Sequence, residues 1–156
     1  MKLEGSYRIA APRQRVWEAL LNPEVLRRVI PGCEKLDAIR DHHYNATFRA
    51  GVGQIRGTFS GDFEVSDLDS QTAYTLRSRM KAAVGFVDGG GRISLSDSET
   101  DSQETLIAYS GDVKIGGLLA SIAGRLIEAA AKKNLDDMFA NLNRELTPSP
   151  TSQPQT

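Results

Sequence analysis

Alternating apolar and polar residues fill most of the first three quarters of the chain and predict an antiparallel sheet. Phe59 and Phe63, for example, have polar neighbours on both sides. Each run of alternation has one apolar and one polar face, which is typical of a sheet with one side on the core and the other in water. The predicted strands with assigned residues are 2–10, 44–52, 55–65, 74–84, 93–95 and 107–115.

Helical spacing predicts two short helices after the first strand and one long helix at the end. Pro12 suits the first turn of the first helix, and Asn22-Pro23 ends it and starts the second, 24–29. After Gly116-Gly117 a stripe at helical spacing predicts one helix to about Leu146, roughly 45 Å long, around which the sheet must curve. Its apolar residues are Leu119, Ile122, Ala123, Leu126, Ile127, Ala130, Leu135, Met138, Phe139, Leu142 and Leu146.

Length and composition fit one domain. The chain has 156 residues, so residues 1–146 form the predicted domain and 147–156, rich in Thr, Pro, Ser and Gln, a disordered tail or linker. The net charge of −1 argues against nucleic-acid binding. A single cysteine, Cys33, excludes an intramolecular disulfide. The sequence shows no signal peptide, so we expect a cytoplasmic protein.

Candidate chemistry is sparse, and we expect neither a catalytic residue nor a metal site. His42 and His43 are adjacent and would point to opposite faces of a strand, so they cannot share one metal ion. Asp112 has the polar parity of its strand, which predicts a solvated carboxylate. The glycines in 51–53 lack the spacing of a dinucleotide fingerprint, and 88–91 is predicted as a loop or hairpin end.

Several sequence segments together resemble the CoxG family of carbon monoxide dehydrogenase subunits, and the Ile-Pro-Gly-Cys segment is the most specific. The order of one strand, two short helices, six strands and a long helix looks like the α+β helix-grip fold of the START-like (SRPBCC) superfamily, with a curved antiparallel sheet of about seven strands. The matching segments are Met1–Tyr7, Ala11–Pro12, Val16–Trp17, Asn22–Glu24, Ile30–Glu34, Gly51–Gly53, Gly57–Gly61, Gly116–Ala120 and Gly124–Ile127.

The resemblance implies a non-catalytic protein that serves a molybdenum-containing carbon monoxide dehydrogenase. Members of the family are thought to recruit that enzyme to the membrane and to bind a quinone-like lipid in the cavity between sheet and helix. It thus implies no covalently bound cofactor, a hydrophobic small molecule and a molybdenum hydroxylase-type enzyme as partners, and peripheral contact with the inner face of the cell membrane. The alternatives are a polyketide cyclase or aromatase-like enzyme and a docking adaptor without a ligand.

Small residues on the apolar parity of the strands have two interpretations. They leave space for a ligand, or they permit a sharply bent sheet. The family resemblance favours the cavity. These residues are Ala46, Ala50, Gly57, Gly61, Ser78, Ala82 and Gly111.

A nearly uncharged wall is expected around that cavity, suited to an apolar or aromatic ligand. Tyr109, Ser78 or a backbone N–H could bond a quinone oxygen. Arg27, Arg28 and Lys81 are expected beside an apolar mouth, and the acidic runs 62–69 and 97–104 at other turns. The predicted ligand-binding residues are Leu26, Ile30, Phe48, Phe59, Phe63, Met80, Phe86, Tyr109, Leu119, Ile122 and Leu126.

Overall fold

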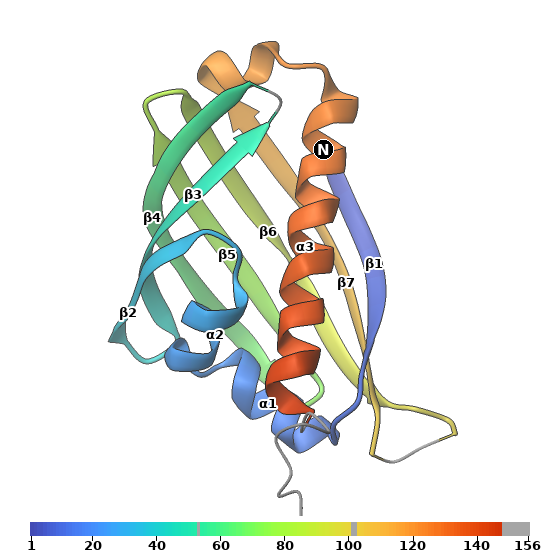
Figure 1. The fold of residues 1–156 in the computed structure, drawn as a ribbon. Helices are drawn as coiled ribbons and strands as arrows, with labels where there is room; N and C mark the ends of the chain where they lie inside the picture. Colours follow the sequence, from blue (N-terminus) through green and yellow to red (C-terminus); the bar gives the residue numbers. More distant parts are fainter. Residues whose placement is uncertain (53, 101–102, 148–156) are drawn as a thin grey trace, which may run out of the picture.

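A seven-stranded antiparallel sheet wraps around one long helix in the computed structural model of the chain, which describes residues 1–52, 54–100 and 103–147 (Figure 1). The strand order is β1-β7-β6-β5-β4-β3-β2. The strands are β1 (Lys2–Ile9), β2 (Cys33–Arg40), β3 (His43–Val52), β4 (Ile55–Asp69), β5 (Ala73–Ala82), β6 (Gly85–Asp97) and β7 (Thr105–Gly116). The helices are α1 (Arg13–Leu20), α2 (Pro23–Val29), the 3-10 helix η1 (Gly117–Ser121) and α3 (Gly124–Leu146).

This architecture confirms the predicted fold class, including the two short helices after β1. The strand β2 is the one to which the pattern assigned no residues. Leu36 is its single buried residue, and its pairing with β3 shifts register near both ends. An edge strand with so few inward contacts has no clear alternation to read. Of the predicted tail, only Thr147 lies within the described residues.

The glycine run at 89–91 lies inside β6, so the prediction of a loop or hairpin end was wrong. Gly91 is paired with Gly111 of β7, and a Cβ on Gly91 would lie 2.6 Å from the carbonyl oxygen of Ser110. The two strands therefore approach too closely there for a side chain.

The C-terminal helix is shorter than predicted because the chain breaks the stripe into two helices. η1 ends at Ser121 and α3 begins at Gly124. Gly117 has a φ of +74°, which glycine adopts without strain, and it turns the chain from β7 into η1. The backbone N–H of Leu119 then donates to the carbonyl of Val84, 2.9 Å away, so η1 closes over the turn between β5 and β6.

The C-terminal half of α3 is packed against α2 and the sheet. Asn141 donates a side-chain hydrogen bond to the Val29 carbonyl, and Asn143 accepts one from the Ala10 backbone N–H. None of the helices in the described ranges combines the length and apolar character needed to cross a membrane. The largest fully buried side chains include Ile9, Val16, Leu36, Ile107 and Leu142.

The close strand approach at Gly61 gives a test of the fold. A Cβ there would lie 1.8 Å from the Arg79 carbonyl oxygen, so Gly61→Ala should lower the free energy of unfolding by about 1–3 kcal/mol, measured by urea denaturation. Gly90→Ala is the matched control, because its Cβ would have no neighbour closer than 3.5 Å. Equal stability of the two variants would contradict this packing.

Candidate ligand-binding cavity

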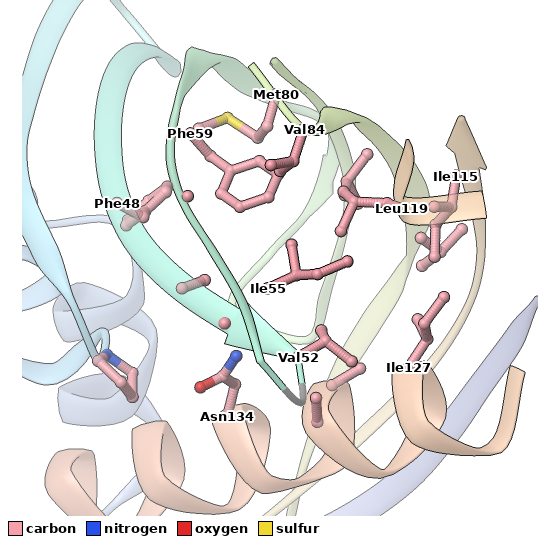
Figure 2. Close-up of a pocket in the computed structure, with 18 of the residues that line it drawn as sticks. Phe48, Val52, Ile55, Phe59, Met80, Val84, Ile115, Leu119, Ile127 and Asn134 are labelled. Carbon is pink, nitrogen blue, oxygen red and sulfur yellow. The ribbon is translucent and has the colours of Figure 1, made fainter. Parts of the chain in front are cut away.

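An apolar cavity of about 320 Å³ lies between the N-terminal half of α3 and the concave face of the sheet (Figure 2). It sits at the end of the molecule where the β3–β4 and β5–β6 turns and η1 gather (Figure 1). The lining residues are Met1, Ile30, Pro31, Phe48, Ala50, Gly51, Val52, Ile55, Gly57, Phe59, Met80, Val84, Val87, Val113, Ile115, Leu119, Ile127, Ala130, Ala131, Asn134, Leu135 and Met138.

Small residues on both sides keep this space open. Ala50 and Gly57 are paired on neighbouring strands, and Ala130 and Ala131 face them from α3. Interiors normally pack to a density of about 0.74, so a cavity persists only where neighbouring side chains are too short to meet. The residues of this wall therefore follow the first of the two interpretations, in which small side chains leave space.

Two other small inward residues lie where neighbouring strands come close together. A Cβ on Gly111 would lie 2.5 Å from the Gly90 carbonyl oxygen, and Gly61 meets the backbone of β5. Neither of them lines the cavity. These glycines serve close contact between strands rather than volume for a ligand.

The cavity wall carries no charged side chain among the described residues. Asn134, on α3, is its single polar side chain, and the remaining lining residues are aliphatic, aromatic, methionine, proline or glycine. Such a wall suits a hydrophobic ligand. It offers no carboxylate, imidazole or lysine that could act as a general acid or base.

The structure brings five of the eleven predicted ligand-binding residues together around the cavity and places six elsewhere. The five are Ile30, Phe48, Phe59, Met80 and Leu119. The six that do not line the cavity are Leu26, Phe63, Phe86, Tyr109, Ile122 and Leu126.

Three of these six belong to the tightly packed part of the core. Phe63 stacks on Tyr44 with 4.8 Å between ring centroids. Tyr109 lies in an aromatic stack with Tyr7 and Phe139, whose centroids are 6.1 and 6.4 Å away. The third, Leu26, is buried on α2. Their rings and methyl groups fill space that a ligand would need.

The other three, Phe86, Leu126 and Ile122, also lie outside the cavity wall. Phe86 pairs with Gly116, where a Cβ would lie 2.0 Å from the Phe86 ring, whereas its neighbour Val87 lines the cavity. Leu126 is 54% exposed because α3 starts at Gly124, which turns its neighbour Ile127 inward. Ile122 falls in the break before α3.

The cavity-lining residues that were not among the predicted ligand-binding residues still follow a pattern in the sequence. The alternation puts Val52, Ile55, Val84, Val113 and Ile115 on the inward parity of their strands. On α3 the inward positions 127, 130, 131, 134, 135 and 138 follow helical spacing. The sequence alone did not show which inward residues face the cavity and which face packed core.

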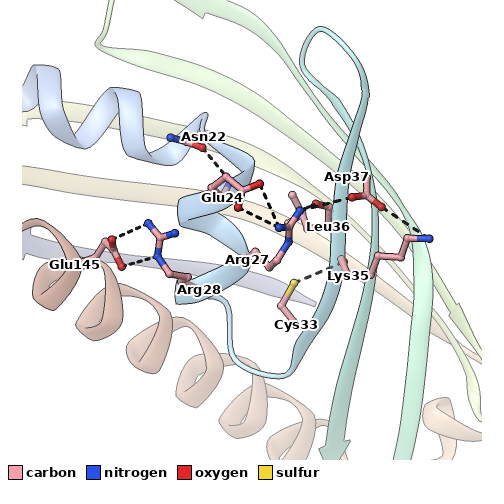
Figure 3. A network of polar contacts seen from close by, with 9 residues as sticks. All are labelled: Asn22, Glu24, Arg27, Arg28, Cys33, Lys35, Leu36, Asp37 and Glu145. Atoms are coloured by element: carbon pink, nitrogen blue, oxygen red, sulfur yellow. Dashed lines mark hydrogen bonds and ion pairs between the residues drawn. The ribbon is translucent and has the colours of Figure 1, made fainter.

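Two arginines predicted beside the mouth are held in ion pairs instead (Figure 3). Arg27 contacts Glu24 and Asp37, and Arg28 donates to both carboxylate oxygens of Glu145, at 3.1 and 2.8 Å. Hydrogen bonding to Arg28 holds the pKa of Glu145 below its usual value. These arginines fasten α2 to β2 and α3, which leaves them paired rather than free for a ligand.

Outside the cavity, the side chains considered for chemistry lie on β2, β3 and β7 and in the turn between β2 and β3. His42 and Asp112 are exposed, as predicted, and His43 pairs with Asp62 at 2.8 Å. Among the described residues no group of three or more His, Cys, Asp or Glu could hold a metal ion. Burial raises the pKa of the Cys33 thiol, which favours its protonated form.

Comparison with known proteins identifies the family. The sequence model for CoxG, the G-type subunit of carbon monoxide dehydrogenase, matches residues 5–147. The chain belongs to the CoxG family. Membership of the CoxG family implies association with carbon monoxide dehydrogenase. No curated protein sequence matches the chain.

Solved structures support the same fold for this CoxG-family chain. A conserved protein from Geobacillus kaustophilus is 27% identical, with a TM-score of 0.87 over 94% of this chain and 95% of its own. A START superfamily protein from Mycobacterium smegmatis is 12% identical, with a TM-score of 0.70 over 93% and 96%. The Zhui aromatase/cyclase from Streptomyces is 17% identical, with a TM-score of 0.64 over 94% and 93%.

Filling the cavity from α3 tests whether it binds apolar molecules. Ala131→Phe puts a ring into the space and should weaken binding of the neutral fluorophore N-phenyl-1-naphthylamine more than about tenfold in a fluorescence titration. Ala129→Phe is the control, because Ala129 is exposed on the same helix and does not line the cavity. If both variants bind the dye like the wild type, the cavity is not the binding site.

Proposed function

We propose that this CoxG-family protein is a non-catalytic carrier that holds a quinone-like lipid in the cavity and serves a molybdenum-containing carbon monoxide dehydrogenase at the membrane. The observation that carries the proposal is the wall without charged side chains, among the described residues, around a space of about 320 Å³ between α3 and the sheet. Family membership supports the identity of the enzyme partner.

The chemistry of the wall supports a carrier rather than an enzyme. Asn134 is neutral and does not titrate in the physiological range, so it cannot exchange protons with a substrate as a general acid or base. In a quinone carrier, the electrons would be transferred in the partner enzyme, and this protein would supply binding alone.

The volume of the cavity limits how much of the ligand it can enclose. It lies at the lower end of the roughly 300–1,000 Å³ typical of small-molecule sites. Apolar burial contributes about 25 cal/mol per Å², so the affinity should rise with isoprenoid length only until the cavity is full. A longer isoprenoid chain would extend beyond the cavity.

The end of the molecule that holds the cavity has features suited to a membrane surface. Leu118 on η1 and Leu126 on α3 are 57% and 54% exposed. The segments 49–61, 77–87 and 113–127, which run through the turns at this end, contain seven Lys and Arg residues and no Asp or Glu. Cations next to exposed apolar side chains favour anionic lipid surfaces by about 1 kcal/mol each.

The ligand can be identified from the purified protein. An organic extract should contain a quinone or related lipid, detected by mass spectrometry. In a fluorescence titration, affinity for quinones should increase with the first isoprenoid units and then level off. An extract without quinone or related lipid, together with no saturable quinone binding, would contradict the carrier proposal and favour an adaptor without a ligand.

Membrane contact is tested by removing the exposed leucines. Leu118→Asp combined with Leu126→Asp should weaken co-sedimentation with phosphatidylglycerol vesicles more than about tenfold, because each leucine contributes about 1.5–3 kcal/mol when buried in lipid. Ile39→Asp combined with Leu68→Asp is the matched control, since these residues are also exposed, 50% and 40%, on β2 and β4. An equal loss of vesicle binding in both double variants would contradict a specific membrane-binding surface. A wild-type protein that binds uncharged vesicles but not phosphatidylglycerol vesicles would also contradict it.

A further inference from the structure

Asn134 is a solvent-exposed residue of α3 whose side chain borders the cavity. The inward positions on this helix include Ile127, Ala130, Ala131, Leu135 and Met138, and helical spacing places Asn134 within the same stripe. An aliphatic residue would complete the stripe and lose no hydrogen bond to the described part of the protein. The amide therefore has no evident role in holding the fold together.

The other asparagines of α3 do have such a role. The side chain of Asn141 donates to the Val29 carbonyl at 2.9 Å, and that of Asn143 accepts from the Ala10 backbone N–H at 2.8 Å. Asn134 makes no hydrogen bond to the residues that the structure describes, and its amide projects from α3 toward the cavity (Figure 2). Because Asn134 is exposed, its N–H groups and its carbonyl oxygen are open to solvent and to a ligand at the rim of the cavity.

The rest of the wall gives a bound molecule a direction. Across the cavity from Asn134, the sheet and η1 contribute apolar side chains such as Phe59, Met80 and Leu119 (Figure 2). A polar atom of a ligand placed against them would lose its hydrogen bonds to water without replacement, which is unfavourable. The side of the cavity next to α3 is where a side-chain amide can restore a hydrogen bond.

We infer that Asn134 binds the polar head group of the ligand and orients it against α3, an inference that rests on the proposed quinone-carrier function. An amide has two N–H donors and a carbonyl acceptor. Its N–H can donate to the carbonyl oxygen of an oxidised quinone, and its carbonyl oxygen can accept from the hydroxyl of the reduced form. Asn134 thus lets one site hold both redox states of the same ligand.

The test compares three ring-matched probes under anaerobic conditions. The probes are 2,3-dimethyl-1,4-naphthoquinone, its hydroquinone and 2,3-dimethylnaphthalene, none of which has the free ring position through which quinones add to thiols. Asn134→Leu should weaken binding of the quinone and of the hydroquinone by about three- to tenfold and leave the hydrocarbon unchanged or slightly tighter. Asn134→Asp can only accept hydrogen bonds when ionised, so it should weaken the quinone while retaining the hydroquinone.

The outcomes separate this inference from the proposed function. If the wild type binds none of the three probes, the carrier proposal fails, and the inference fails with it. If the wild type binds them and Asn134→Leu keeps the original preference for the quinone over the hydrocarbon, the cavity is a binding site but Asn134 does not hold the head group. Lys132→Leu is the control for an added leucine on α3 outside the cavity wall, and an equal loss there would also overturn the inference.

Discussion

Uneven packing along α3 is the constraint on which the rest of the structure depends. In its C-terminal half, Phe139, Leu142 and Leu146 are buried, and Asn141 and Asn143 bond the surrounding backbone. In its N-terminal half, Ala130 and Ala131 line the cavity together with Ala50 and Gly57 of the sheet, and these small side chains leave the space between helix and sheet open. One helix thereby anchors the fold at one end and leaves a cavity at the other.

This division lets the fold tolerate an open space that would otherwise weaken it. A cavity costs the contacts that its lining residues fail to make. The aromatic stack of Tyr7, Tyr109 and Phe139, and the ion pair between Arg28 and Glu145, lie with the packed half of α3. The cavity end combines the apolar wall, the exposed leucines and an excess of cations, so the proposed carrier function is concentrated there.

The sequence predicted the apolar nature of the candidate site but only some of the residues that line it. Alternation correctly placed Phe48, Phe59 and Met80 on the inner face and in the cavity wall. It placed Phe63 on the same face, but there the ring of Tyr44 fills the space. Alternation along one strand shows which side chains point to the inner face of the sheet. Whether a cavity forms there depends on the size of the side chains that the neighbouring strands and the helix place at the same level.

The sequence by itself determined the fold class and the lack of charged side chains on the inner face, because these follow from periodicity, element order and residue types along the chain. Its short motifs carried the resemblance to the CoxG family. Tertiary structure alone decided where α3 begins, which glycines serve strand contact, and which inward residues surround free volume. The start of α3 at Gly124 set Ile127 toward the cavity and left Leu126 in solvent. Helix phase and strand register join residues far apart in sequence, and no local pattern contains that information.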